Sequence, residues 1–393
     1  MKKEDVYLGY KECVLPTYTR TPLIFVKGKG SRLWDISNRE YLDFFPGWGV
    51  GNLGHCHPKV MSAIRDQLGK LIFVPNNYYH VPQAQLAREL IYRTFKGRVF
   101  FCNSGTEANE AAIKFSRKYG KGRYEIITFE NSFHGRTLGS LAATGQKKYQ
   151  DGFAPLPGGF KTVPFGDIAA VRGALSDKTV AVMIELIQGE GGINVAAKEF
   201  VSELRELCTQ KDILLIVDEV QTGIGRTGTY FCFEHFDITP DIVTVAKALG
   251  GGLPIGAMVV RDEISSVLGP GMHASTFGGG PVICRAALAV LRALHREKLL
   301  SNAKKAGHYL TSELLRLRKK HAVIKDVRGI GLMIGVELTI DGSEVIRSCQ
   351  EHRLLLNCTH GNVIRFMPAL QVSRGQLKKA VRIFEKALTG LSY

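Results

Sequence analysis

The sequence predicts an α/β protein with a large domain, whose mostly parallel sheet is covered by helices, and a small α+β domain built from both termini. Two observations lead to this fold class. Short apolar runs alternate with helical patterns from about residue 98 onward, as in parallel sheets covered on both faces. The chain of 393 residues is also longer than a typical domain with a single hydrophobic core, which predicts two domains. We expect residues 1–50 and 291–393 to form the small domain and residues 51–290 the large one.

The elements follow in chain order. Residues 20–45 contain short apolar bursts separated by turn residues, which predicts a three-stranded meander. Residues 57–70 have the apolar spacing of a helix, and so does the segment from about 281 to 320. The last part of the chain again alternates short strands and helices. The strands expected in the large sheet are 99–103, 125–130, 180–186, 213–218, 242–246 and 255–260.

Composition excludes several classes of protein. The chain is 45% hydrophobic and 22% charged, which argues against disorder, and its 43 glycines follow no fixed period. Its eight cysteines form no CxxC pair, so reduced and mostly buried thiols are expected. The N-terminus lacks an apolar signal core, and no apolar run reaches membrane-spanning length. We therefore expect a cytoplasmic protein with no membrane partner.

The chain is strongly basic, with a net charge of +16. This charge permits an acidic partner but does not select one. Residues 291–330 hold eleven Lys and Arg against three Asp and Glu. A solvated helix face explains such a run, whereas a nucleic-acid surface lacks any RRM, KH or helix-turn-helix signature to support it. No nucleic-acid partner is predicted.

Chemistry-bearing residues gather where the expected strands end. Ser104, Gly105 and Thr106 lie between a strand and a long helix, where free N–H groups and the helix dipole stabilise an anion. A plain Ser/Thr helix cap is the alternative explanation. Asp218 ends a very apolar strand, and a buried carboxylate is costly without a cationic partner. The protonated pyridine nitrogen of a cofactor would supply that partner.

Two further segments add a lysine and a ring-binding loop. Lys247 directly follows an apolar strand, where desolvation lowers the pKa of the amine and makes Schiff-base formation accessible. An exposed lysine at a strand end is the simpler alternative for this residue alone. Phe133 is placed to stack on a flat ring, and Arg136 to clamp a carboxylate. An anion cradle, a buried carboxylate, a lysine and an aromatic residue together make the inventory of a pyridoxal-phosphate site.

Two other segments resemble binding motifs of different kinds. Residues 223–228 read GIGRTG and satisfy GxGxxG, but no helical pattern follows, as a dinucleotide-binding turn requires. His55 and His57 flank Cys56, yet no second ligand pair with zinc-like spacing follows them. We therefore predict no metal, and regard a nucleotide-dependent oxidoreductase as a weaker alternative.

The motifs SGTEANEAAIK, FHGRT, DEVQTGIGRTG, AKALGGGLPIGA and STFGGGP resemble those of class III aminotransferases with the type I pyridoxal-phosphate fold. The resemblance covers nearly the whole chain. It implies that Lys247 binds the cofactor covalently and shuttles a proton, while Asp218 keeps the pyridine nitrogen protonated. The implied cofactor contacts are completed by Ser104, Gly105, Thr106, Phe133, Val220 and Gln221, and by Thr276, which reaches the phosphate of a partner subunit in a homodimer.

Within the class, the chain is similar to members that act on N2-acetyl-L-ornithine and 2-oxoglutarate in arginine biosynthesis. The resemblance implies that Glu190 pairs with Arg365, which binds the keto acid, and that Ser275 joins Arg136 at the carboxylate of the donor. Other donors stay open: ornithine, N-succinyl-diaminopimelate or a carrier-linked lysine precursor. A glutamate-semialdehyde aminomutase is disfavoured because the chain has TEANEAAIK and the HGRT loop.

Overall fold

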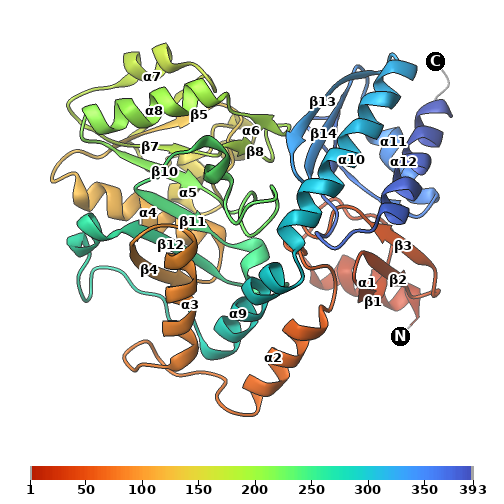
Figure 1. Cartoon of the computed structure of the whole chain (residues 1–393), viewed down its shortest axis with the longest axis horizontal. Helices are drawn as coiled ribbons and strands as arrows, with labels where there is room; N and C mark the ends of the chain where they lie inside the picture. The colour runs from red at the N-terminus through yellow and green to blue at the C-terminus, as the bar shows by residue number, and fades with distance from the viewer. Residues whose placement is uncertain (1, 391–393) are drawn as a thin grey trace.

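The computed structural model describes residues 2–390 and has two lobes. Figure 1 shows elements from both ends of the chain in one lobe and the central part of the chain in the other. This arrangement is the α/β fold class expected from the sequence. The boundaries at residues 50 and 290 remain a prediction. Among residues 2–390, no helix is long and apolar enough to cross a membrane.

The larger lobe contains a seven-stranded sheet in the order β4-β12-β11-β10-β7-β5-β6. Its strands are β4 (Gly97–Cys102), β5 (Glu125–Phe129), β6 (Phe160–Val163), β7 (Thr179–Ile184), β10 (Leu214–Asp218), β11 (Ile242–Val245) and β12 (Gly256–Arg261). The neighbouring pairs from β11 to β6 are parallel, whereas β12 runs antiparallel to both β11 and β4. All six expected strands are present. The edge strand β6 was not expected, because only one of its four residues is buried and it has no continuous apolar run.

Helices cover both faces of this sheet. Alternate residues of β10 belong to different hydrophobic clusters: Leu214 and Ile216 to one, Leu215 and Val217 to the other. Successive strand side chains point to opposite faces, so this sorting requires an apolar layer on each side. The helical elements around the sheet are α2 (Pro58–Leu68), α3 (Val81–Arg93), α4 (Gly105–Tyr119), α5 (Leu138–Ala143), α6 (Lys147–Gln150), α7 (Ile168–Ala174), α8 (Lys198–Gln210), α9 (Pro281–Arg296), η1 (Cys232–Phe236), η2 (Lys247–Gly250) and η3 (Asp262–Val267).

The smaller lobe joins the two ends of the chain through a strand pair. The expected meander is present, and β15 adds to it parallel to β3, with Leu354 opposite Leu42. A second, antiparallel sheet has the order β13-β14-β17-β16. The elements are α1 (Lys3–Cys13), β1 (Phe25–Lys29), β2 (Arg32–Asp35), β3 (Glu40–Asp43), α10 (Leu299–Lys320), β13 (Ile324–Ile330), β14 (Met333–Leu338), α11 (Ser343–Glu351), β15 (Leu354–Leu355), β16 (Asn357–Thr359), β17 (Val363–Phe366) and α12 (Arg374–Thr389). The short β8 (Ile187–Gln188) and β9 (Asn194–Val195) pair with each other.

Three details answer questions raised by the sequence. The helical segment from 281 to 320 is two helices, α9 and α10, separated at Lys298, whose φ of 55° is left-handed. The GIGRTG segment forms turns and leads into the 3₁₀ helix η1, not into the α-helix that a dinucleotide site needs. His55 and His57 each contact a carboxylate, Asp43 at 2.7 Å and Glu297 at 3.2 Å respectively.

Candidate active site

Parallel pairing brings chemistry-bearing residues to one edge of the large sheet. Asp218 is the last residue of β10, Glu185 directly follows β7, and Lys247 lies two residues beyond β11. The loop with Phe133 follows β5 in the same way. Because the carboxyl ends of parallel strands lie at the same edge, four segments that are distant in sequence meet there.

Asp218 is the buried carboxylate at the centre of this edge, with 4% of its surface exposed. Its Oδ2 accepts hydrogen bonds from Asn109 Nδ2 and His134 Nδ1, both at 2.8 Å. Its Oδ1 accepts from the backbone N–H of Val220 at 3.0 Å. These three donors fix the plane of the carboxylate.

His134 and Glu185 form a buried pair of titratable groups beside Asp218. Burial alone would lower the pKa of His134, but the hydrogen bond that it donates to Asp218 and the charges of Asp218 and Glu185 raise it overall. Burial raises the pKa of Glu185 to about 7, against the opposing charge of His134. The Glu185 carboxylate accepts from the backbone N–H of Phe133 at 2.8 Å. Glu185 therefore holds the loop that carries the aromatic ring.

Lys247 is half-buried at the start of η2, with a left-handed φ of 40°. Burial lowers the pKa of its amine below the ordinary value, although nearby carboxylates oppose that shift. These carboxylates are Glu190, Asp218 and Glu185. The result is an amine whose neutral form is more accessible than that of a solvent-exposed lysine.

The predicted anion cradle is the first turn of α4. Ser104 is the N-cap, and its hydroxyl accepts from the backbone N–H of Glu107 at 3.3 Å. The N–H groups of Gly105 and Thr106 have no partner within the helix, as at every helix N-terminus. A Cβ atom on Gly105 would lie 2.6 Å from Cγ1 of Val220, so only glycine lets this turn approach the loop after Asp218 so closely.

Arg365 on β17 is paired with Glu190. Its guanidinium donates to Glu190 at 2.7 Å and 3.3 Å, to the carbonyl of Gly189 at 2.9 Å and to Asn357 Oδ1 at 2.8 Å. The side chain is 1% exposed, and its carbon Cζ lies 4.6 Å from the centre of the Phe45 ring. The charge of Arg365 helps to hold the pKa of Glu190 below its ordinary value, against the effect of burial.

Gln221 lies next to this pair. Its Nε2 is 3.4 Å from Glu190 Oε1, at the long limit of a hydrogen bond. Its Oε1 is buried without a hydrogen-bond partner among residues 2–390. A buried amide oxygen without a partner costs about 1–3 kcal/mol, so this one calls for a ligand that supplies a donor.

Arg136 lies beside two aromatic rings in the loop after β5. Its Cζ is 4.2 Å from the centre of the Tyr149 ring and 5.6 Å from that of Phe133. The two rings contact each other edge to face, with their centroids 5.5 Å apart. Arg136 is exposed, and no hydrogen bond or ion pair of its guanidinium is found among residues 2–390. Its donors are therefore available to a carboxylate.

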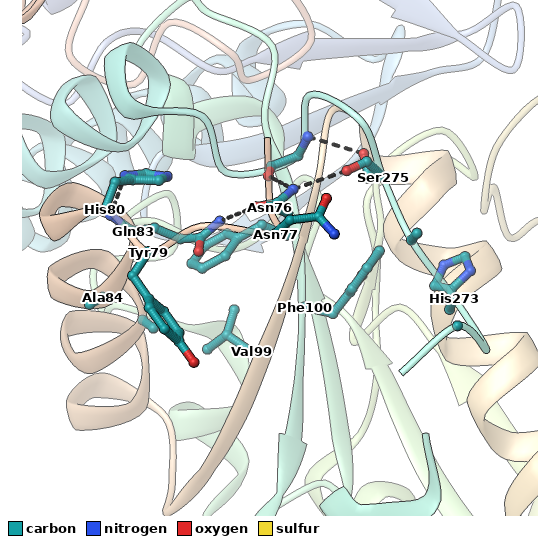
Figure 2. A pocket seen from close by; sticks show the side chains of 15 residues that line it. Asn76, Asn77, Tyr79, His80, Gln83, Ala84, Val99, Phe100, His273 and Ser275 are labelled. Carbon is teal, nitrogen blue, oxygen red and sulfur yellow. Dashed lines mark hydrogen bonds between the residues drawn. The ribbon is translucent and has the colours of Figure 1, made fainter. Parts of the chain in front are cut away.

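Ser275 and Thr276 lie elsewhere, in an exposed loop beyond η3. Ser275 lines the pocket of Figure 2, and its hydroxyl accepts from Asn103 Nδ2 at 3.2 Å and from the N–H of Gly278 at 3.1 Å. The described residues show no contact between Ser275 and Arg136. Thr276 is exposed and makes no hydrogen bond to any residue from 2 to 390.

Sequence reasoning missed three of the residues that build the site. Asn109 lies one turn into α4, and its spacing from Gly105 places both on the same helix face. Glu185 directly follows the apolar run of β7, as Asp218 ends that of β10, so the same strand-end signal applied to it. Tyr149 carried no local signal, because only the fold places α6 beside Arg136.

Comparison with known proteins identifies the class. Residues 14–388 match the model of the family described as aminotransferase class-III, and the chain belongs to this family. It is a pyridoxal-phosphate-dependent aminotransferase. Acetylornithine aminotransferase of Methanocaldococcus jannaschii is 50% identical over 386 residues, which cover 96% of each chain. That of Caldanaerobacter subterraneus subsp. tengcongensis is 48% identical over 98% of this chain and 99% of the relative.

Solved structures agree with the fold. An ornithine aminotransferase from Toxoplasma gondii, with partial occupancy of PLP at its active site, has a TM-score of 0.95 and 34% identity over 99% of this chain and 94% of that one. Acetylornithine aminotransferase from Elizabethkingia anophelis has a TM-score of 0.89 and 32% identity over the full length of both chains.

The residues at the sheet edge fit pyridoxal 5'-phosphate. The first turn of α4 could offer N–H groups to the phosphate, and Asp218 a fixed carboxylate to the protonated ring nitrogen. Gln221 has a buried amide oxygen without a hydrogen-bond partner among residues 2–390, which a donor on a bound ligand would satisfy. Lys247 would supply the amine for a covalent bond to the cofactor.

Proposed function

We propose that the chain transfers the terminal amino group of N2-acetyl-L-ornithine to 2-oxoglutarate, giving N-acetyl-L-glutamate 5-semialdehyde and L-glutamate. The proposal rests chiefly on the contrast between an open cation, Arg136, and a masked one, Arg365. The acetylornithine aminotransferases that are similar to this chain over nearly its whole length support the choice of donor.

In the reaction, pyridoxal phosphate supplies an electron sink for the carbon that loses its proton. The amine of Lys247, whose pKa is lowered by burial, would take that proton from the amine-bearing carbon of the donor and deliver it to carbon C4′ of the cofactor. In the second half-reaction it would move a proton from C4′ to the keto carbon of 2-oxoglutarate. Asp218, fixed by its three donors, would hold the proton on the ring nitrogen. Phe133, fixed through Glu185, covers the ring and excludes water.

The donor reacts through its terminal amine, so its α-carboxylate lies several bonds from the reacting carbon. We assign Arg136 to that carboxylate because its guanidinium donors are free of protein acceptors among the described residues. The assignment of Ser275 to the same carboxylate has no support from contacts within one chain, so it requires the loop of a partner subunit.

2-Oxoglutarate reacts at the carbon next to its carboxylate and needs a cation there. We assign Arg365, whose ion pair with Glu190 hides that charge while the donor reacts. An unpaired Arg365 would attract the α-carboxylate of the donor and present the wrong amine. In the second half-reaction the carboxylate of 2-oxoglutarate displaces Glu190, exchanging one charge-assisted pair for another.

We further propose that the enzyme is a homodimer with shared active sites, in which Thr276 of one subunit reaches the phosphate bound by the other. An exposed apolar surface around this loop supports the dimer. It consists of Leu71, Ile72, Phe73, Tyr78, Tyr79 and Phe277. The rings of Phe73 and Phe277 lie 5.6 Å apart, joining the two segments into one surface. The cytoplasmic location remains a prediction.

A comparison of donors under steady-state conditions tests the proposed reaction. Purified enzyme loaded with pyridoxal phosphate is assayed with 2-oxoglutarate and each of four donors: acetylornithine, ornithine, N-succinyl-diaminopimelate and a carrier-linked lysine precursor. We expect kcat/KM to be highest for acetylornithine. A higher value for another donor would identify that donor as the substrate, and the protein would still be an aminotransferase. Light scattering of the same sample tests the dimer.

A further inference from the structure

The loop that bears Thr276 is held by a set of side-chain amides on its own subunit. The Nδ2 group of Asn76 donates to the carbonyl of Ser275 and to that of Gly278, both at 3.0 Å. These carbonyls lie immediately before and two residues after Thr276. Both hydrogens of one amide group are thus used to fix the two sides of a short turn (Figure 2).

Asn76 is itself held in place. Its Oδ1 accepts from Nε2 of Gln83 at 2.8 Å, and Gln83 also donates to the carbonyl of Gly279 at 3.3 Å. From the other side, Asn103 Nδ2 donates to the hydroxyl of Ser275, and Asn103 directly precedes the N-cap of α4. The clamp, defined here as Asn76, Gln83 and Asn103, thus connects the loop to α3 and to the start of α4.

The same loop packs against the edge strand of the large sheet. A Cβ atom on Gly278 would lie 2.2 Å from the carbonyl oxygen of Phe101 in β4, so this part of the turn rests on the strand backbone. Thr276 and Phe277, by contrast, are exposed, Phe277 to 66%. The turn is therefore fixed at both ends while its tip projects into the solvent of a single subunit.

We propose that Asn76 is a positioning residue that presents Thr276 to the cofactor phosphate of the partner subunit. The proposal rests on the shared site proposed above, and it adds the clamp that orders the loop bearing Thr276. Without the clamp, the tip must be ordered at the moment of contact, and fixing the backbone of each loop residue costs about 1–2 kcal/mol. With the clamp, the loop is already ordered when the protein folds. The contact of Thr276 with the phosphate therefore loses no conformational entropy of the loop on cofactor binding.

The test measures cofactor affinity of the full-length protein, not activity. Apoenzyme is titrated with pyridoxal phosphate and, separately, with pyridoxal, which lacks the phosphate. The variants are Asn76→Ala, Asn76→Asp and Thr276→Ala. Asn77→Ala is the matched control, because Asn77 lines the same cavity of about 530 Å³ and makes no side-chain hydrogen bond among the described residues.

We expect Asn76→Ala to weaken binding of pyridoxal phosphate by about tenfold, as for loss of a hydrogen bond to a charged group. Asn76→Asp should lose at least as much, because it places an oxygen against two carbonyl oxygens. Pyridoxal should bind the wild type and these variants equally, and Asn77→Ala should match the wild type throughout. The double variant Asn76→Ala/Thr276→Ala should bind no more weakly than Thr276→Ala alone.

Three results would overturn the proposal: unchanged affinity of Asn76→Ala, an equal loss for pyridoxal and its phosphate, or additive losses in the double variant. An equal loss is what a general loosening of the fold would produce. Failure of the shared site has a different signature. Thr276→Ala would then bind pyridoxal phosphate as tightly as the wild type, and the protein would scatter light as a monomer.

Discussion

Arg136 and Arg365 hold their charges in opposite ways. Arg365 is 1% exposed and fully engaged, with Glu190 as counter-ion and further acceptors from Gly189 and Asn357. Arg136 is exposed and contacts the faces of Tyr149 and Phe133. A buried guanidinium requires a counter-ion, whereas an exposed one remains hydrated until a ligand arrives. The difference teaches that any anionic ligand of a buried arginine such as Arg365 must compete with the counter-ion that burial requires.

The largest expected effect comes from a substitution that slows both half-reactions equally. Lys247→Ala takes away the covalent anchor and the proton shuttle that both half-reactions need. General acid–base catalysis alone contributes about 10²–10⁴-fold, so each half-reaction should slow at least that much. Single-turnover rates with donor and with 2-oxoglutarate measure it, and near wild-type rates in either would refute the role of Lys247.

The next prediction extends the comparison to carboxylates. Glu190 has a cationic partner, whereas Glu219, fully buried beside Asp218, has none among residues 2–390, and burial raises the pKa of Glu219 to about 7. An unfolded glutamate titrates near 4.3, so the folded protein binds the extra proton between these values and loses stability as the pH rises through them. The loss should reach about 4 kcal/mol for this group.

The Glu219→Gln variant carries no such proton. The free energy of unfolding of the wild type should therefore fall between pH 5 and pH 7.5 by an amount that the variant does not lose, so the variant becomes more stable relative to the wild type as the pH rises. Urea unfolding of both proteins at the two pH values measures the change. A difference between variant and wild type that does not depend on pH would contradict the raised pKa.

The arginines themselves should divide the two half-reactions. Arg136→Ala should chiefly weaken the use of acetylornithine, and Arg365→Ala should chiefly raise the KM for 2-oxoglutarate. Loss of a charge-assisted contact costs on the order of 1.5–3 kcal/mol, or about ten- to a hundredfold. Each half-reaction is measured separately in both variants. Equal losses in both half-reactions for both variants would contradict the assignment of one arginine to each half-reaction. They would not contradict the aminotransferase activity.

The smallest effect concerns the rings under Arg136. Tyr149→Leu removes the ring face 4.2 Å from the guanidinium carbon, whereas Tyr149→Phe keeps it. An exposed cation–π contact contributes about 0.5–1 kcal/mol, so the KM for the donor should rise two- to fivefold in the leucine variant alone. The KM for 2-oxoglutarate serves as internal control. Equal donor KM values for the two variants would show that the ring does not position Arg136.

Local patterns predicted much of the fold and part of the site. Continuous apolar runs marked six strands of the large sheet, and Asp218 and Lys247 were recognised because each directly follows such a run. The pattern failed where burial is incomplete, as in β6, whose short run is only partly buried. It also could not place Tyr149, which no strand end or helix face marks.

Sequence by itself determined most of the candidate site residues, because strand periodicity and strand ends are local properties of the chain. Tertiary structure decided which of them meet. Arg365 and Glu190 are 175 residues apart and come from different lobes, and their pairing was implied by family resemblance, not by any local pattern. The hydrogen bonds of Asn109 to Asp218 and of Asn76 to Ser275 likewise span 109 and 199 residues. Contacts of this kind depend on sheet order and loop packing, because the energy that selects them comes from burial of the whole core.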